Sequence, residues 1–380
     1  MISCGEPSGD LYAGALATEL RRLEPAATIV GLGGRHLRDA GASLTADFGG
    51  LSVTGLLEVF RVLPRTYRTY RGLVRQAQTD RPDVFVAIDF PDFNFRLARA
   101  VRRLGVPVVY YISPQLWAWR RGRMTTMREI ANRVLVIFPF EESIYRDAGI
   151  PVQWVGHPLL DVTRPTESRA TFLSTLGLDP ARPVVALLPG SRHNEVEAIL
   201  PDLVRSGSLI RDQVAGTQFI LPRAPHLDDG SFAPLNGLSG VVVIEGRADD
   251  VLAVADVALV ASGTVTVQAA LHECPMVVVY RLSPLTYRLG KPFVHVDTYA
   301  MANLVAGRRV VPELIQDDFT PERVAAEALK VLTDPTHAAS VRRDLHEVRG
   351  RLGAPGASRR AAEAVLEVAR ASREPRSTIG

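Results

Sequence analysis

Short apolar runs rich in Val and Ile alternate with helical patterns along most of the chain. Continuous runs of this kind are typical of parallel strands that helices cover on both faces. A first series lies at 28–32, 84–88, 106–112, 134–138 and 152–155, after a short strand pattern at 1–4. A second series lies at 184–188, 219–221, 241–244, 257–260 and 276–280. The pattern predicts an α/β protein of two doubly wound, Rossmann-like domains.

A proline-containing stretch at 158–183 separates the two series. We therefore expect one domain over residues 1–160 and a second over 161–345. Residues 346–372 are predicted to form a helical segment that packs on the first domain or on a partner, and 373–380 a disordered tail. Because ligands bind outside the carboxyl ends of the strands in such sheets, the two domains are expected to face a central cleft.

The composition narrows the class of protein. Hydrophobic residues make up 47% of the 380 positions and charged residues 22%, as in soluble globular proteins. The formal charge of +3 is too small to indicate bulk binding of nucleic acid. Two cysteines form no disulfide framework, and no signal peptide or membrane-spanning stretch is visible, which favours the cytoplasm. Neither an Asp-x-Asp pattern nor a metal-spaced His or Cys cluster is present, so we expect no metal and no cofactor.

Two loops of the second domain suit an anion. The run 184–188 leads into Pro189-Gly190-Ser191-Arg192, where small residues let the backbone approach a phosphate and Arg192 adds a forked charge. The run 257–260 leads through Ala261 into Ser262-Gly263-Thr264 and a helix, which adds a second set of backbone donors. Together the loops predict a pyrophosphate site. Asn303 is a further polar candidate.

The corresponding loops of the first domain carry acidic side chains, whereas the loop of the second domain carries the positively charged Arg192. The loop Gly5-Glu6-Pro7-Ser8-Gly9-Asp10 is no dinucleotide fingerprint. A helix cap would explain Asp10 or Ser8, but it would leave Glu6 unexplained. Asp89 ends the run 84–88 and reaches the same sheet edge, which makes it a candidate general base.

Three further residues are candidates for the cleft, and each has a structural alternative. Trp117 and Arg120 belong to a cluster of tryptophans and arginines that suits a binding wall and a packed corner equally well. His157 follows the run 152–155 near the domain junction, and a lone histidine there is more often structural than catalytic. Both interpretations stay open.

A stretch near residue 60 differs from the rest in kind. Apolar residues are followed there by arginines, which suits an anionic membrane surface or an acylated substrate. A helix that covers the sheet and exposes a charged face is the alternative. The residues that we assign to acyl or membrane contact are Leu56, Leu57, Val59, Phe60, Val62, Leu63, Arg65 and Arg68.

In this order the motifs resemble the lipid-A-disaccharide synthases, a family of GT-B glycosyltransferases, over nearly the whole chain. The motifs that carry the resemblance are Gly5 to Asp10, Asp89 to Asn94, Ser113-Pro114 with Trp117 to Arg120, Gly156-His157, Pro189 to Arg192 with Glu195, Ser262 to Thr264, and Asn303-Leu304.

The resemblance implies a reaction and its participants. UDP-2,3-diacylglucosamine would donate its sugar to the 6-hydroxyl of 2,3-diacylglucosamine 1-phosphate, giving a β-1′,6 disaccharide and UDP with inversion. The family needs no metal and associates peripherally with the anionic inner-membrane surface. The resemblance makes Asp89 the base, places Glu6, Ser8 and Asp10 on the acceptor side, and places Arg192 and Asn303 on the UDP side. Assembly into a homo-oligomer is left open.

One departure from the family concerns Gln268, where the family usually has Glu. That carboxylate accepts hydrogen bonds from the ribose hydroxyls. An amide oxygen accepts without charge, so we expect UDP binding to be weaker by about 1 kcal/mol. Gln268→Glu is then expected to tighten UDP.

Two other functions fit part of the pattern. Another GT-B enzyme acting on UDP-N-acetylglucosamine, an epimerase or a peptidoglycan-type transferase, would share the nucleotide loops. An epimerase needs no lipid-facing stretch, so 56–63 argues against it. A non-catalytic nucleotide-binding membrane adaptor would not need Glu6, Asp10 and Asp89.

Overall fold

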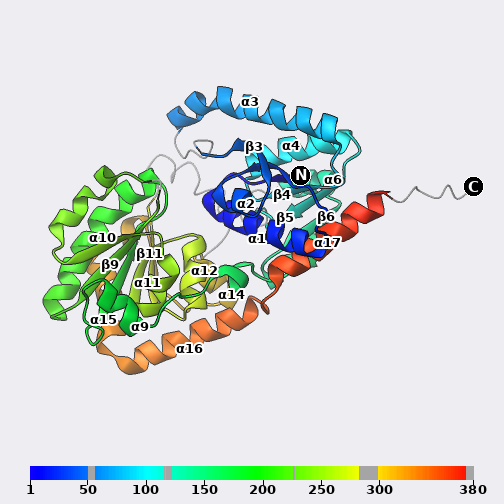
Figure 1. The fold of residues 1–380 in the computed structure, drawn as a ribbon. Coiled ribbons are helices and arrows are strands. Elements are labelled where there is room, and N and C mark those ends of the chain that lie inside the picture. Colours follow the sequence, from blue (N-terminus) through cyan, green and yellow to red (C-terminus); the bar gives the residue numbers. More distant parts are fainter. Residues whose placement is uncertain (50–55, 115, 117–121, 226, 282–297, 374–380) are drawn as a thin grey trace, which may run out of the picture. The chain divides into compact units, whose positions relative to one another are not determined.

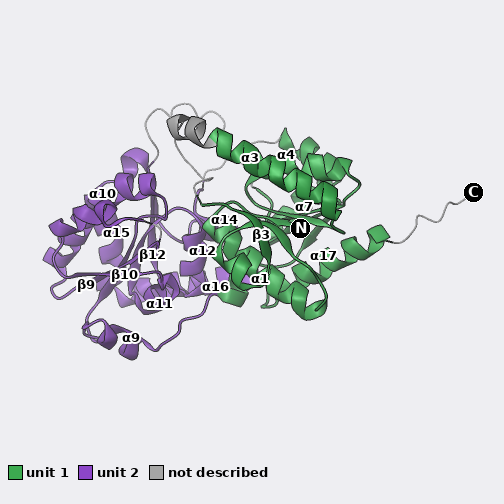
Figure 2. Ribbon diagram, turned by 45° about the horizontal axis from the view of Figure 1, so that its top comes forward, with its two compact units in different colours: residues 1–162, 352–380 green, residues 163–351 purple. Residues whose placement is uncertain are grey.

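The computed structural model describes residues 1–49, 56–114, 116, 122–225, 227–281 and 298–373, with side chains of 56–62 excluded. The chain forms two compact units (Figure 2). Unit 1 combines Met1–Val162 with Leu352–Gly380, and unit 2 is Thr163–Arg351. The predicted candidates Trp117 and Arg120 lie outside the described residues.

Unit 1 is built on a seven-stranded, all-parallel sheet in the order β3-β2-β1-β4-β5-β6-β7. The order reverses between β1 and β4, the kind of switch point at which doubly wound sheets bind ligands. The strands are β1 (Ile2–Ser3), β2 (Val30–Gly33), β3 (Ser43–Asp47), β4 (Phe85–Ile88), β5 (Val108–Tyr111), β6 (Arg133–Val136) and β7 (Val152–Trp154).

Helices cover both faces of this sheet (Figure 1). On one face, α3, α4 and α6 pack Leu73, Leu97 and Met127 onto an apolar core with Phe85 and Tyr110. On the other face, α1 and α17 lie side by side. The helices are α1 (Pro7–Leu23), α2 (Arg35–Asp39), α3 (Leu56–Asp80), α4 (Pro91–Arg103), α6 (Arg123–Ile130), α7 (Pro139–Asp147), α8 (Leu159–Val162) and α17 (Ala357–Arg373).

Unit 2 contains a six-stranded parallel sheet in the order β10-β9-β8-β11-β12-β13. Its strands are β8 (Val184–Leu188), β9 (Gln218–Arg223), β10 (Val241–Glu245), β11 (Val257–Ala261), β12 (Met276–Tyr280) and β13 (Glu313–Ile315). Its helices are α9 (Arg169–Thr175), α10 (His193–Gln213), α11 (Ala248–Val254), α12 (Thr264–Leu271), α14 (Met301–Ala306), α15 (Pro321–Thr333) and α16 (Pro335–Arg351), with 3₁₀ turns η1 (Asp229–Gly237) and η3 (Gln316–Asp318).

Two Rossmann-like α/β units confirm the predicted fold class, and every predicted apolar run overlaps a strand. The strands β3 and β13 were not predicted. Both lie at sheet edges and are short, and β3 exposes alternate residues, so neither has a continuous apolar run.

The C-terminal helices divide between the two units. The helix α16 belongs to unit 2, so the division falls after Arg351 and the predicted boundary at 345 lies inside that helix. The helix α17 packs on unit 1, where Asp161 accepts hydrogen bonds from the backbone N–H groups of Gly356 (2.5 Å) and Ser358 (2.8 Å). At its other end, Arg373 forms two hydrogen bonds with Asp83, of 2.7 and 2.6 Å. Of the predicted tail 373–380, Arg373 is the last residue of α17, and residues 374–380 lie outside the described residues.

Candidate functional site

The switch point of unit 1 brings the Glu6 loop and the Asp89 loop together. The strands β1 and β4 are neighbours, with Ser3 opposite Ala87, so both loops leave the same sheet edge. The Phe90 ring lies directly on the Gly5 backbone, where an added Cβ would stand 2.2 Å from a ring carbon. Gly5 is therefore required for the contact between the two loops.

Asp89 has an unusual backbone. Its φ is 43°, and that of Phe90 is 50°, so two successive residues other than glycine occupy the left-handed region. Such residues persist only where surrounding contacts hold them, and they cluster at functional sites. The Asp89 carbonyl oxygen accepts hydrogen bonds from the Tyr110 hydroxyl and from the Asn94 side-chain amide, both of 2.8 Å. The Asp89 side chain is half-buried.

Asp10 has a structural function within unit 1. Its carboxylate is buried and accepts hydrogen bonds from the backbone N–H groups at the start of α2. The acceptor distances are 2.7 Å for Gly34, 2.8 Å for His36 and 3.2 Å for Leu37. Asp10 thus stabilises the N-terminus of a helix 25 residues away, rather than that of its own helix. Ser8 lies half-buried in the first turn of α1.

His157 is a buried, neutral side chain. Burial lowers the pKa of its imidazole to about 3, well below the usual value. The ring packs edge-on against Tyr12 and close to Phe138. Its Nδ1 accepts a hydrogen bond of 3.2 Å from the Leu159 N–H, which assigns the ring proton to Nε2. Burial and these contacts favour the structural interpretation of His157.

In unit 2, the predicted phosphate loop contains a carboxylate of its own. One Glu195 oxygen accepts hydrogen bonds from the N–H groups of Ser191 (3.2 Å) and Arg192 (3.3 Å). The other oxygen lies 2.9 Å from the Arg192 guanidinium. Gly190 has a φ of 122°, and a Cβ there would stand 2.6 Å from the Glu195 carboxylate. The Arg192 charge is therefore balanced, and a bound phosphate would have to share these donors.

The second donor loop lies next to the first. The strands β8 and β11 pair with Leu188 opposite Val260, so the loops that follow them leave neighbouring positions. Gly263 and Thr264 are exposed at the N-terminus of α12. The Ser262 hydroxyl donates to the Tyr299 carbonyl oxygen at 3.3 Å. The structure thus brings together the two loops that the sequence assigned to a pyrophosphate.

Gln268 contacts an acidic residue that sequence reasoning missed. Its amide nitrogen donates to an Asp249 carboxylate oxygen at 3.3 Å, and the same oxygen lies 3.1 Å from Nε2 of His272. Asp249 comes from the neighbouring helix α11. With its nitrogen toward Asp249, the Gln268 amide has its oxygen as the remaining acceptor.

The Asn303 side chain is buried and fully occupied by its own chain. Its nitrogen donates to the Val311 carbonyl oxygen (2.9 Å) and to Glu313 (2.6 Å). Its oxygen accepts from the N–H groups of Val310 (2.7 Å) and Val311 (3.0 Å). These bonds use both donors and both lone pairs, so Asn303 fixes the segment between α14 and β13.

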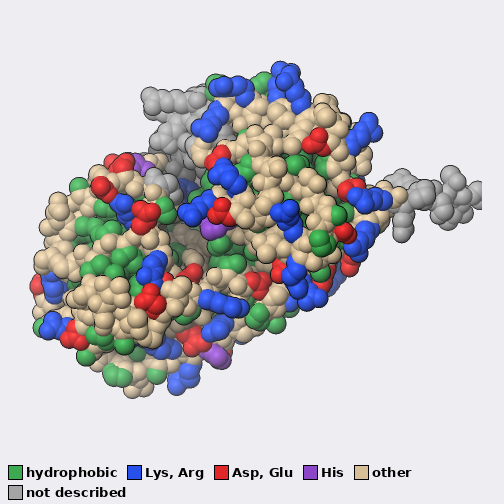
Figure 3. Space-filling view, in the orientation of Figure 1, with side chains coloured by type: hydrophobic (Ala, Val, Ile, Leu, Met, Phe, Trp, Pro, Cys, Tyr) green, Lys and Arg blue, Asp and Glu red, His purple; other side chains and the backbone are tan. Residues whose placement is uncertain are grey.

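The described part of α3 exposes an apolar and basic surface. Leu63 is 47% exposed and Tyr67 is 60% exposed, whereas Leu73 on the same helix is buried in the core. Arg65 and Arg68 are also exposed, and basic side chains gather over this helix at the top of the view in Figure 3. The helix begins at Leu56, but the side chains of the predicted contact residues Leu56, Leu57, Val59, Phe60 and Val62 lie outside the description. Within the described ranges, no helix is long and apolar enough to cross a membrane.

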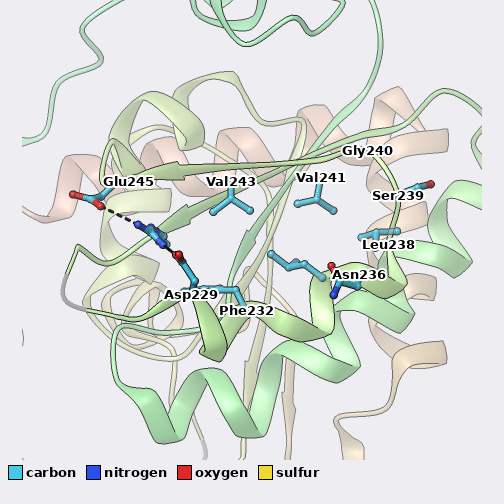
Figure 4. A pocket seen from close by; sticks show the side chains of 11 residues that line it. Asp229, Phe232, Asn236, Leu238, Ser239, Gly240, Val241, Val243 and Glu245 are labelled. Carbon is cyan, nitrogen blue, oxygen red and sulfur yellow. Dashed lines mark hydrogen bonds and ion pairs between the residues drawn. The ribbon is translucent and has the colours of Figure 1, made fainter.

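A pocket in unit 2 contains none of the predicted site residues (Figure 4). It has a volume of about 670 Å³ and lies between η1 and the edge strand β10. Phe232 and Val243 form part of its apolar wall, and Arg223 lies 3.2 Å from Glu245 at one end. The pocket is separate from the two donor loops.

Sequence comparisons identify relatives over nearly the whole length of the chain. The family model described as Lipid-A-disaccharide synthetase matches residues 1–368. The lipid-A-disaccharide synthase of Geobacter metallireducens is 46% identical over 370 residues, 97% of this chain and 96% of the relative. That of Myxococcus xanthus is 42% identical over 370 residues, 97% of each chain.

Solved structures show the same fold at much lower identity. A complex of Staphylococcus aureus MnaA with UDP has a TM-score of 0.70 at 13% identity and covers 100% of this chain and 99% of its own. The calicheamicin glycosyltransferase CalG4 has a TM-score of 0.60 at 17% identity, covering 98% of both chains. These likenesses support the GT-B class and leave the choice of activity to the closer relatives. By the family model and the identity to its curated relatives, the chain belongs to the lipid-A-disaccharide synthetase family of glycosyltransferases.

Proposed function

We propose that the protein transfers the sugar of UDP-2,3-diacylglucosamine to the 6-hydroxyl of 2,3-diacylglucosamine 1-phosphate. The products are the β-1′,6-linked disaccharide 1-phosphate and UDP. Membership of the family supports this reaction. The observation that carries the site assignment is the left-handed Asp89, held at the switch point beside the Glu6 loop.

Asp89 is the base of a single displacement. Its carboxylate removes the proton of the acceptor hydroxyl, and the hydroxyl oxygen attacks the anomeric carbon of the donor sugar on the face opposite UDP. The bond from that carbon to the diphosphate oxygen breaks, and its electron pair leaves with UDP. One carboxylate is enough, because inversion needs only one displacement. A positioned base contributes about 10²- to 10⁴-fold to such a step.

Glu6 and Ser8 take the acceptor side of the site, where the Gly5–Phe90 contact places their loop beside Asp89. Asp10 supports this region indirectly, through the N-terminus of α2. His157 is a neutral residue that packs against Tyr12 and Phe138. In these roles, Glu6, Ser8, Asp10 and His157 keep the same charge throughout the reaction.

The UDP side is formed by the two donor loops of unit 2. The backbone N–H groups at Gly190 to Arg192 and Ser262 to Thr264 stabilise the negative charge that develops on the leaving diphosphate. The Gln268 oxygen accepts from a ribose hydroxyl. Asn303 supports the UDP side indirectly, because its hydrogen bonds fix the backbone of 310–311 and the Glu313 carboxylate.

The exposed surface of α3 receives the acyl chains at the cytoplasmic face of the inner membrane. Leu63 and Tyr67 present apolar surface, and Arg65 and Arg68 attract anionic headgroups. A surface that combines apolar and basic side chains binds in the plane of the membrane interface, so the protein associates peripherally with the membrane.

The deciding experiment incubates the purified protein with both diacylated substrates and follows the products by mass spectrometry. Disaccharide and UDP are expected in equal amounts. Release of UDP without disaccharide would contradict the synthase assignment. A parallel incubation with UDP-N-acetylglucosamine alone tests for epimerisation, and a 2-epimer there would favour the rival activity.

A further inference from the structure

The buried amide of Asn94 connects the ends of the two central strands of unit 1. Asn94 lies in the first turns of α4 and is fully buried. Its nitrogen is within hydrogen-bond distance of three carbonyl oxygens, those of Asp89 (2.8 Å), Ile88 (3.2 Å) and Ser3 (3.2 Å). Its oxygen accepts a hydrogen bond of 2.7 Å from the Ser3 hydroxyl, which fixes the orientation of the amide.

These contacts meet where the backbone is strained. Asp89 and Phe90 both have positive φ, a conformation that must be held by the surroundings. The Tyr110 hydroxyl gives the Asp89 carbonyl oxygen a second donor at 2.8 Å. Burial raises the pKa of Tyr110 well above its usual value, so the phenol stays protonated and remains a donor. The Asp89 carbonyl thus has two donors from two elements, α4 and β5.

The direction of the Asp89 carboxylate depends on this backbone. With a negative φ, the usual state of an aspartate, the side chain would leave the strand end in a different direction. The Phe90 ring would also leave Gly5, which would separate the base from the Glu6 loop. A displacement of about 1 Å at a reacting group can cost about 100-fold in rate.

We infer that Asn94 is a positioning residue for the reaction, which holds Asp89 in its left-handed conformation and sets the carboxylate toward the acceptor hydroxyl. The inference rests on the proposed function of Asp89 as the base. Tyr110 assists through the same carbonyl oxygen. Neither side chain needs to touch a substrate, so both act on the chemical step rather than on UDP binding.

The test is a double-mutant cycle between Asn94→Ala and Asp89→Asn, with kcat, KM and the dissociation constant of UDP measured for each. Asn94→Ala is expected to lower kcat about 100-fold and to leave UDP affinity unchanged. In the double variant, loss of Asn94 is expected to add nothing, because Asp89→Asn has already removed the group that it positions. Phe85→Leu, a core variant in β4, the strand that ends just before Asp89, controls for lost stability.

The outcomes separate the two claims. Additive effects, or an Asn94→Ala enzyme no slower than Phe85→Leu, would overturn the positioning role and leave the base in place. Near-normal turnover of Asp89→Asn alone would remove the base and the positioning role together. If Asn94→Ala does not fold, Tyr110→Phe enters the same cycle, because it removes one donor from the same oxygen and keeps the ring.

Discussion

The side-chain amide of Gln268 donates to Asp249 at 3.3 Å, across the contact between α12 and α11. Asp249 therefore orients the amide and leaves its oxygen as the acceptor. It also places a negative charge beside the position where the family usually has Glu. The departure at 268 thus belongs to a pair of residues, and the effect of reversing it depends on Asp249.

This pair changes the expectation for Gln268→Glu. From the sequence alone, the substitution is expected to tighten UDP by about 1 kcal/mol. In the structure the new carboxylate would face Asp249, and like charges this close oppose each other. We predict that Gln268→Glu alone gives no gain, whereas Gln268→Glu with Asp249→Asn tightens UDP. Isothermal titration calorimetry measures both, and tightening by the single variant would contradict the pairing.

Replacing the proposed base should affect turnover and not nucleotide binding. Asp89→Asn is expected to lower kcat by about 10²- to 10⁴-fold, because the amide cannot accept the hydroxyl proton. UDP affinity should stay at the wild-type value. Asp92→Asn is the matched control, since Asp92 is exposed in the first turn of α4 and paired with Arg123 of α6. Equal loss in both variants would rule out a specific function for Asp89.

The phosphate loop should not tolerate a side chain at residue 190. In Gly190→Ala, the positive φ is expected to cost about 1–3 kcal/mol of unfolding free energy. The added Cβ would also push Glu195 off the N–H groups of the loop. Urea unfolding and UDP titration should both show the loss. Gly350→Ala, at an open helical position, should instead be neutral or stabilising.

The buried His157 should make stability depend on pH. Its pKa is about 3 in the folded protein and about 6.5 when exposed, so between these values only the unfolded chain binds the proton. Stability should therefore fall as pH decreases through this window, by up to about 1.4 kcal/mol per pH unit. Urea unfolding at pH 7 and at pH 5 should show that the free energy of unfolding decreases less in His157→Gln than in the wild type. The exposed control His337→Gln should behave like the wild type, and a His157→Gln curve parallel to the wild type would contradict the prediction.

Binding to vesicles should depend on both parts of the α3 surface. Leu63→Asp should weaken binding to phosphatidylglycerol vesicles by removing apolar contact. Replacing Arg65 and Arg68 with Ser should weaken it by about 1 kcal/mol per residue and reduce its salt dependence. Co-sedimentation measures both effects, with Arg343→Ser on α16 as the control. Undiminished binding of both variants would locate the membrane surface elsewhere.

Much of the fold could be predicted from the sequence, because its signals are local. A strand buried on both faces must be apolar throughout, so β4, β8 and β11 are visible as continuous runs. The same topology predicts that the residues after neighbouring strands meet at one edge, as Gly5 and Phe90 do. The edge strand β3 lacked this signal, because one of its sides is exposed.

The two Rossmann-like units, the family and the loops that carry the candidate residues can all be inferred from the amino-acid sequence. The contacts of those residues become visible only in the folded chain. Asp10 caps α2, the Asn303 side chain forms all its hydrogen bonds with residues 310–313, and Asp249 orients Gln268. Each of these contacts joins different elements of the fold, so their partners depend on how helices and strands pack. Local patterns report which residues are polar, whereas packing decides whether a polar group faces a ligand or its own chain.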